Sequence, residues 1–196
     1  FNTDESSSEY VKLMQSANNP LLNRAINAAY PPASTFKVIM TAALLSENTF
    51  PADKKIECKG SMLYGGRVVH CHQHDPGHGW LDLREGLAQS CDIYYWTIGR
   101  DYLGVDSISY YAKEFGLGQD TKIDLPSSTN GFMPTAQWKE RRYHEKWVGG
   151  DTMAISIGQG YTLITPLQMA DMMAMVANSG VIYKPHLLKE VRDPVT

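Results

Sequence analysis

The chain has 196 residues, of which 43 % are hydrophobic and 20 % are charged, a composition that supports one buried core and excludes a disordered chain. Its formal net charge of −3 and its pI near 6.1 lack the basic excess of nucleic-acid-binding proteins, so no nucleic-acid partner is expected. No apolar run approaches the ~20 residues of a membrane span, and no signal-peptide pattern opens the chain. Any membrane anchor would therefore lie outside this sequence.

The first predicted element begins behind two prolines at positions 31 and 32. A helix can start after proline but cannot continue backwards through it. Five apolar residues then recur at helical spacing: Phe36, Ile39, Met40, Ala43 and Leu44. We therefore predict a helix from Ser34 to about Asn48 with one buried face. The acidic, serine-rich residues 3–9 at the chain start are expected to be a loop or a loose end.

Two further helices are predicted on either side of Ser90. Asp82 and Glu85 have the spacing of a capping box, which predicts a helix through about Gln89. Ser90 then falls in a turn, and the next helix runs from residue 92 or 93 to about residue 100.

Three helices and one strand are predicted in the second half of the chain, from capping residues, glycine stops and apolar periodicity. Their expected bounds are Asp106 to Gly116, Thr135 to Arg142, Thr165 to Gly180 and, for the strand, 181–183. The last of these helices is expected to bury an apolar face that includes Met169, Met173 and Val176. The methionines from 153 to 175 are expected to pack in the core.

Ser34 and Lys37 are the first candidate catalytic residues. Residues three apart are neighbours on a helix, so Lys37 is expected to lie over Ser34. A lysine can take the proton of a serine hydroxyl if burial or a second cation keeps its amine neutral. The helix N-terminus adds N–H groups and a positive dipole end beside the reacting oxygen. The pair also arises by chance, as a surface serine beside a solvated lysine.

A second serine motif, Ser90-Cys91-Asp92, follows at a plausible distance, and several short words accompany the two motifs. The words are Pro-Leu-Leu-Asn-Arg-Ala (20–25), Tyr-Pro-Pro-Ala-Ser-Thr-Phe-Lys (30–37), Gly-His-Gly (77–79), Ser-Cys-Asp-Ile-Tyr-Tyr (90–95), Ile-Asp-Leu-Pro (123–126), Gly-Asp-Thr (150–152), Ile-Gly-Gln-Gly-Tyr (157–161) and Thr-Pro-Leu-Gln-Met-Ala (165–170). Together they resemble the transpeptidase domain of class B penicillin-binding proteins, most closely the penicillin-binding protein 2 branch of cell elongation. The resemblance implies an α+β penicillin-recognising serine transpeptidase fold, an antiparallel sheet packed by helices, here mainly its helical part and truncated.

The chain departs from the family pattern in three ways. Asp92 stands where many relatives have asparagine, although this branch often carries aspartate there. No Lys-Thr-Gly or Lys-Ser-Gly occurs, and the family's N-terminal anchor and pedestal domain are absent. Residues 1–196 are therefore expected to be a partial transpeptidase domain that is nearly inert alone, while the parent protein is active.

The resemblance implies acyl transfer on peptidoglycan stem peptides that end in D-Ala-D-Ala. Ser34 would attack the penultimate carbonyl with Lys37 as the general base. Ser90 would relay the proton to the leaving D-alanine, and Asp92 would orient Lys37 or the substrate. A β-lactam would trap Ser34 as a stable ester. Gly158, Gln159 and Gly160 are expected to line the site from below, with a plain turn as the alternative, and the candidate substrate-binding residues among them are Gln159 and Gly160.

All three cysteines and four of the six histidines fall between residues 58 and 91. Cys58, Cys71, His78 and Cys91 supply three thiolates and one imidazole, a full tetrahedral shell for structural Zn²⁺. The penicillin-binding protein 2 branch resembles the chain here too, which implies a zinc site beside the active centre. Ligation of Cys91 would then fix the second catalytic motif. The alternatives are a Cys58–Cys71 disulfide, unlinked core thiols, and His72 as a ligand in place of Cys71.

The same resemblance implies the cellular setting of the parent protein. It would be held at the bacterial inner membrane, with its catalytic domain on the periplasmic or extracytoplasmic side. Its partners would be an elongation glycosyltransferase and a rod-shape scaffold protein. Three other functions stay open: a septal cell-division transpeptidase, a class D β-lactamase, and a non-catalytic β-lactam-sensing or scaffold-docking fragment.

Overall fold

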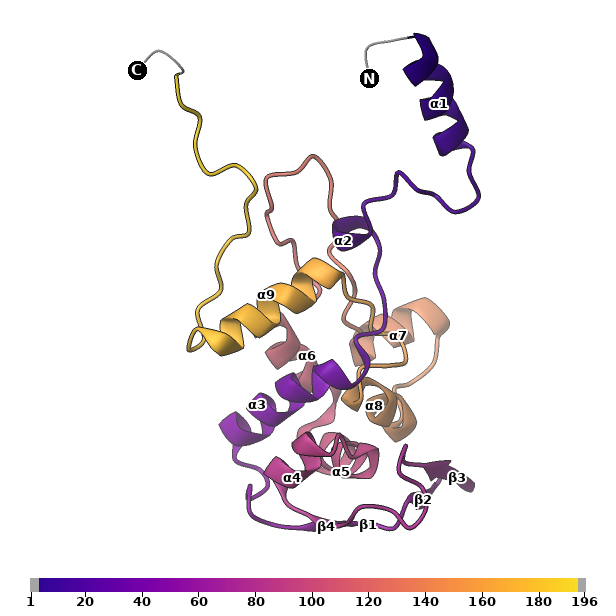
Figure 1. Cartoon of the computed structure of the whole chain (residues 1–196). Coiled ribbons are helices and arrows are strands. Elements are labelled where there is room, and N and C mark those ends of the chain that lie inside the picture. Colours follow the sequence, from indigo (N-terminus) through magenta and orange to yellow (C-terminus); the bar gives the residue numbers. More distant parts are fainter. Residues whose placement is uncertain (1–3, 194–196) are drawn as a thin grey trace.

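The computed structural model describes residues 4–193, and the side chains from residue 8 onward. It mixes helices with small antiparallel sheets, as an α+β domain does (Figure 1). The helical elements are α1 (Asp4–Met14), α2 (Arg24–Asn27), the 3₁₀ turn η1 (Ala33–Phe36), α3 (Lys37–Glu47), α4 (Leu83–Ala88), α5 (Asp92–Ile98), the π-helical η2 (Gly99–Leu103), α6 (Gly104–Glu114), α7 (Ala136–Tyr143), α8 (Gly149–Ser156) and α9 (Pro166–Ala177). The strands are β1 (Ile56–Cys58), β2 (Ser61–Tyr64), β3 (Arg67–His70) and β4 (Gly79–Leu81). Within residues 4–193, no helix is both long and apolar enough to cross a bilayer.

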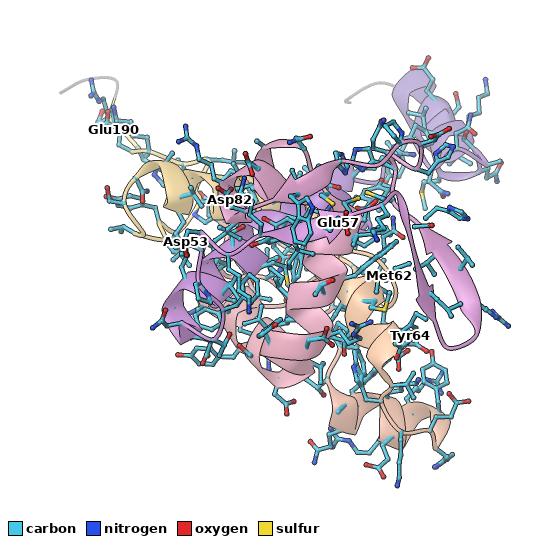
Figure 2. The ribbon with its side chains drawn as sticks, turned by 90° about the horizontal axis from the view of Figure 1, so that it is seen from below. Asp53, Glu57, Met62, Tyr64, Asp82 and Glu190 are labelled. Carbon is cyan, nitrogen blue, oxygen red and sulfur yellow. The ribbon has the colours of Figure 1, made fainter. Side chains whose placement is uncertain are left out.

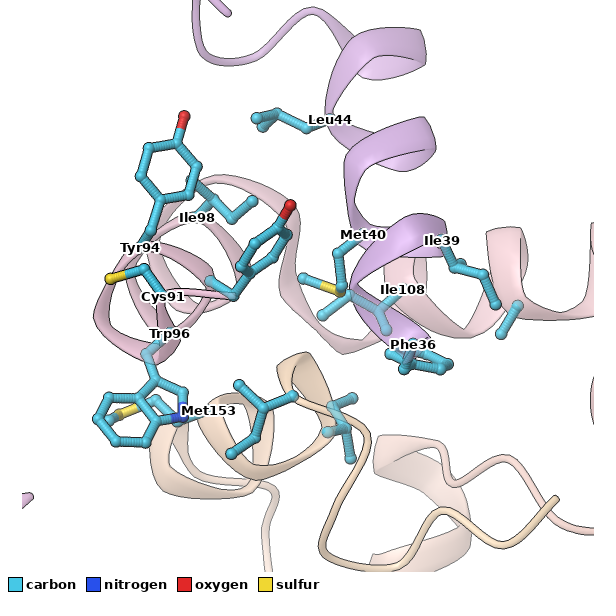
Figure 3. Packing of buried hydrophobic residues seen from close by; sticks show 14 of the residues in the cluster. Phe36, Ile39, Met40, Leu44, Cys91, Tyr94, Trp96, Ile98, Ile108 and Met153 are labelled. Carbon is cyan, nitrogen blue, oxygen red and sulfur yellow. The ribbon is translucent and has the colours of Figure 1, made fainter. Parts of the chain in front are cut away.

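The core forms around α3, which packs against α4, α5 and α6. The five apolar residues predicted to face inward on this helix are all fully buried, which confirms the predicted inner face. Figure 3 shows Met40 and Leu44 of α3 on the side that faces α5, Phe36 of η1 at the start of the helix, and Trp96 of α5 beside Met153 of α8. This packing fixes α3 relative to α5, and these two helices carry the two serine motifs.

The capping predictions for α4, α7 and α9 are confirmed. Asp82 and Glu85 form a reciprocal capping box, in which the backbone N–H of each residue donates to the side-chain carboxylate of the other. Thr135 caps α7, and Thr165 forms a second capping box with Gln168. These caps satisfy N–H groups that a helix start otherwise leaves without partners.

Four element predictions differ from the structure. Residues 4–14 form α1 where a loose end was predicted, and Lys12 in its last turn complements the helix dipole; residue 3 lies outside the described residues. Helix α6 starts at Gly104, which puts Asp106 in its first turn and not at the cap.

Residues 181–183 form no strand, because no strand in residues 4–193 lies beside them to complete a ladder. Helix α8 was not predicted, since two glycines open it.

The apolar face of α9 is also smaller than predicted. Met172 is fully buried, but Met173 and Val176 are each 46 % exposed. Of the methionines between 153 and 175, Met153 and Met172 pack in the core as expected. Within the described residues nothing covers the remaining face of α9, so its other apolar side chains stay in contact with water.

The strands form two antiparallel pairs, β1 with β4 and β2 with β3. The β2–β3 hairpin turns through Gly65 and Gly66, whose φ values of 57° and 76° fit the two-residue turn that matches strand twist. Figure 2 shows the hairpin projecting from the helices, with Tyr64 at its far end near α8, where the Tyr64 hydroxyl lies against Gly149. The β1–β4 pair sets Cys58 opposite Gly79, so the two ends of the segment that contains the hairpin lie side by side.

Candidate active site and metal centre

Ser34 lies in η1, the 3₁₀ turn that leads directly into α3. Pro31 and Pro32 precede the turn, and Ala33 has a left-handed φ of 50°. Ser34 is exposed, and within residues 4–193 no hydrogen bond holds its hydroxyl. The hydroxyl is therefore free to reach a bound molecule from the start of a helix.

Lys37, one turn further on, is the buried cation of the site, with a side chain only 1 % exposed. Its Nζ lies 2.6 Å from Asp92 Oδ1, 2.7 Å from the Ser90 carbonyl oxygen and 3.0 Å from Ser90 Oγ. Lys37 was predicted to be able to lie over Ser34 and to be oriented by Asp92, and these three oxygens of the second motif hold its amine. A carboxylate and two further acceptors outweigh a single exposed hydroxyl.

Two residues that the sequence analysis did not propose for the site, Tyr95 and Thr41, contact Lys37. The Tyr95 ring centroid lies 5.6 Å from Lys37 Nζ, within the range of a cation–π contact. The Tyr95 hydroxyl and Thr41 Oγ1 are 2.6 Å apart, and Thr41 in turn donates to the Lys37 carbonyl oxygen. Burial raises the pKa of Tyr95, which keeps this hydroxyl neutral.

Ser90 and Asp92 come from the tight turn between α4 and α5. Ser90 has a φ of 52°, a conformation uncommon for a residue other than glycine and typical of strained functional sites. Asp92 is the first residue of α5, so its carboxylate sits at the positive end of that helix. Its two oxygens are divided: Oδ1 accepts from Lys37, and Oδ2 accepts from the backbone N–H of His72 at 3.1 Å. Asp92 thereby connects Lys37 to the segment that carries Cys71 and His72.

The four predicted metal ligands come together. The ligand atoms of Cys58, Cys71, His78 and Cys91 all lie within 4.8 Å of one another, and three of the four residues are buried. His78 Nδ1 is 3.4 Å from Cys58 Sγ and 3.6 Å from Cys71 Sγ. Tetrahedral Zn²⁺, with Zn–S about 2.3 Å and Zn–N about 2.05 Å, would set such N–S pairs about 3.6 Å apart. The donor set and its spacing therefore fit the ion.

The three thiols are unlinked, so the structure does not contain the Cys58–Cys71 disulfide. Cys91 shares a hydrogen bond with Cys71; this lowers the pKa of Cys71 to about 4 and raises the pKa of Cys91 above its usual range. His72 stands outside the four-residue cluster: it is about half exposed, and its Nδ1 lies 3.6 Å from Asp92 Oδ2. It groups with Cys71 and Asp92, beside the four ligands.

The turn after α8 contains the predicted substrate-binding residues. Gln159 and Gly160 are exposed, and Gln159 borders a pocket of about 240 Å³ with Trp96 and Met153 among its walls. Neither residue contacts Ser34 directly. Gly158, one position earlier, contacts the residue before Ser34: its carbonyl oxygen accepts the N–H of Ala33 at 2.9 Å.

Comparison with known proteins identifies relatives of the whole chain. Residues 2–196 match the family model of the penicillin binding protein transpeptidase domain. The chain is 35 % identical to peptidoglycan D,D-transpeptidase MrdA from Haemophilus influenzae over 191 residues, which cover 97 % of this chain and 29 % of that protein.

Solved structures show the same similarity. The PBP2 chain in a complex of penicillin-binding protein (PBP2) and MreC from Helicobacter pylori superposes with a TM-score of 0.87 at 30 % identity, covering 95 % of this chain and 35 % of that one. A second solved chain comes from a peptidoglycan synthase complex that coordinates polymerization and crosslinking. It superposes with a TM-score of 0.84 at 34 % identity, covering 93 % of this chain and 31 % of that one. The chain therefore spans about a third of the length of the proteins it resembles.

Proposed function

The chain belongs to the penicillin-binding protein transpeptidase family, in its class B penicillin-binding protein 2 branch, and from this premise we propose that the protein carrying it is a peptidoglycan D,D-transpeptidase. The observation that carries the proposal is the contact of the buried Lys37 amine with both Ser90 and Asp92, one helical turn from the exposed Ser34. A nucleophile at a helix start, a buried amine and a second hydroxyl are the groups that acyl transfer requires.

The reaction begins when Ser34 Oγ attacks the carbonyl carbon between the two D-alanines. The Ser34 proton passes to Lys37, which must be neutral at that moment, and the backbone N–H of Ser34 would donate to the developing oxyanion. The amide C–N bond then breaks, and Ser90, 3.0 Å from Lys37 Nζ, relays the proton to the departing amine of D-alanine. An amine of a second stem peptide attacks the Ser34 ester, forms the cross-link and returns the serine.

The family's third motif, a Lys-Thr-Gly or Lys-Ser-Gly strand, does not occur in this sequence. In the family this strand completes the oxyanion hole, and one missing donor typically costs about 10²–10³ in rate. Residues 1–196 alone should therefore react slowly with substrates or β-lactams, and activity belongs to the whole protein.

We also propose that Cys58, Cys71, His78 and Cys91 hold a structural Zn²⁺. Four protein ligands leave no open position, so the ion would cross-link chain segments and would take no part in the chemistry. Cys91 lies between Ser90 and Asp92, so holding its sulfur restricts the backbone of both catalytic candidates. Unlinked core thiols are the remaining alternative.

The proposed setting follows from the substrate and from the relatives. Peptidoglycan lies outside the cytoplasm, so the catalytic domain would face the periplasmic or extracytoplasmic side of the inner membrane. A PBP2 relative has been solved with MreC, and another relative belongs to a complex that coordinates polymerization and crosslinking. By similarity, a rod-shape scaffold protein and an elongation glycosyltransferase are the proposed partners.

Labelling with a fluorescent penicillin tests the nucleophile. In the full-length protein, Ser34→Ala should abolish the covalent adduct, while a change at Ser46, an exposed serine on the following helix α3 (Ser46→Ala), should leave it intact. An adduct that persists in Ser34→Ala would refute the assignment. An adduct that the wild-type protein rapidly hydrolyses would favour a β-lactamase instead.

Native mass spectrometry tests the metal proposal. One zinc per chain is expected, lost on chelation or in Cys58→Ser, with a melting temperature lower by several degrees in both cases. A chain that carries no zinc, has three alkylatable thiols and shows an unchanged melting curve would instead have ordinary core thiols.

A further inference from the structure

The turn that follows α8 presses against the turn that carries Ser34. Gly158 accepts the N–H of Ala33 through its carbonyl oxygen at 2.9 Å, and its own N–H donates to the Ile155 carbonyl oxygen at 2.9 Å. These two bonds join the end of α8 to the residue directly before the nucleophile. The last turn of α8 and the start of η1 are therefore one hydrogen-bonded unit.

Gly158 has no room for a side chain. A Cβ atom there would lie 2.2 Å from the Ala33 carbonyl oxygen, 2.8 Å from the Ala33 nitrogen and 2.8 Å from Phe36 Cβ. Real Cβ atoms do not approach other atoms so closely, and two of these neighbours are backbone atoms that cannot rotate away. Ala33 and Phe36 are the two ends of η1, so the glycine contacts the nucleophile's turn on both sides of Ser34.

Ala33 needs such a support, because its φ of 50° is in the left-handed region. L-residues with a Cβ enter this region only when their surroundings hold them there. The hydrogen bond to Gly158 is the contact that fixes the Ala33 amide, and the next peptide unit carries the N–H of Ser34.

From this geometry we infer that Gly158 is a positioning residue for Ser34: its close approach to Ala33 and Phe36 sets the place of the nucleophile. The inference rests on the proposed function, and it extends that function to a residue that touches neither substrate nor Ser34. Relieving a 2.2 Å contact requires a shift of about 1 Å, and such a displacement of a reacting group can cost about 10²-fold in rate.

The test compares Gly158→Ala with Gly104→Ala in the full-length protein. Both glycines have a positive φ, 68° and 73°, so an alanine strains the backbone at either position. A Cβ at Gly104 would meet nothing within 4 Å, which makes it the matched control. The rate constant of acylation by benzylpenicillin, the dissociation constant of the complex that precedes acylation, and the melting temperature are measured for each.

The expected result is an acylation rate constant about 100-fold lower in Gly158→Ala and within about 3-fold of wild type in Gly104→Ala. The dissociation constant of the noncovalent complex should stay close to wild type in both, a separation that a general loss of structure would not produce. Equal acylation rates in the two variants would overturn the inference.

Hydrogen exchange on the unmodified protein gives a second test that needs no variant. The Ala33 amide should exchange slowly, because it donates to Gly158. Exchange as fast as in an unstructured loop would overturn the inference even if Gly158→Ala does not fold. A wild-type protein that penicillin does not acylate at all would refute the proposed function, an outcome distinct from equal rates in the two variants.

Discussion

Replacing Asp92 by asparagine keeps the shape of the side chain and removes the charge that faces Lys37. The two groups are 2.6 Å apart, with side chains 1 % and 14 % exposed for Lys37 and Asp92. Breaking a buried pair by removing one partner typically costs about 3–5 kcal/mol, because a desolvated charge is left behind. The asparagine oxygen and the two Ser90 oxygens still accept from Lys37, so we expect the lower end, about 3 kcal/mol.

Urea denaturation and thermal melting of the two proteins measure this loss. For a chain of this size about 3 kcal/mol corresponds to a melting temperature lower by roughly 6–12 °C. The matched control is Glu190→Gln, the same carboxylate-to-amide change in an exposed pair with Arg192, for which a loss of at most about 1 kcal/mol is expected.

A third variant examines the cause of the loss. Adding Lys37→Met to Asp92→Asn removes the unpaired ammonium, so the double variant should be more stable than Asp92→Asn alone. If Asp92→Asn costs no more than Glu190→Gln, or if the double variant is less stable than Asp92→Asn, the account of Lys37 as a buried charge held by Asp92 is wrong.

Three further outcomes are expected. Leu44→Ala should lower the free energy of unfolding in urea by about 2–5 kcal/mol, against less than about 1 kcal/mol for its neighbour Leu45→Ala, because Leu44 is fully buried and Leu45 is 57 % exposed; equal losses would contradict the core described above. Tyr94→Phe should leave stability unchanged or raise it by about 1 kcal/mol, since the buried Tyr94 hydroxyl has no hydrogen-bond partner among residues 4–193; a loss of more than about 1 kcal/mol would reveal a partner. The backbone N–H groups of Leu188 and its predecessor lower the pKa of Asp124, so their stabilisation is complete above the ordinary carboxyl pKa of about 4 and disappears as pH falls through the lower folded value. Hydrogen exchange at the Leu188 amide should therefore lose protection in acid, beyond the intrinsic pH dependence of exchange, and protection that does not change with pH would contradict this.

The sequence predicted the helices whose signals are local. Apolar spacing after two prolines located α3 and its buried face, and cap residues located the starts of α4, α7 and α9. Helix α8 escaped because Gly149 and Gly150, poor helix formers, open it, and its stability comes from packing against α5 and η2. The strand expected at 181–183 failed for the opposite reason: its residues favour extended backbone, but a strand also needs a neighbour.

The candidate site divides in the same way. Residue types and family words identified Ser34, Lys37, Ser90 and Asp92, but the contact of Lys37 with residues 53 and 55 positions later is a tertiary property. The His72 backbone N–H that holds Asp92 could not be predicted, because every residue except proline carries that donor.

Gly158 shows how near a pattern can come to the relevant residue. The Gly-Gln-Gly stretch predicted that residues 158–160 line the site and favoured Gln159 and Gly160 for substrate, while Gly158 makes the contact with Ala33. A sequence marks a glycine but cannot say which atoms its missing Cβ would meet.

The β2–β3 hairpin has a practical consequence for work on this protein. It leaves and rejoins the body of the molecule near Cys58 and Gly79, and a Cβ at either glycine of its turn would meet no atom within 4 Å. Extra residues inserted between Gly65 and Gly66 would therefore extend into solvent without displacing the segments that precede Ser90. The tip is a place where a fluorophore or an affinity tag can be attached to follow the protein in living cells.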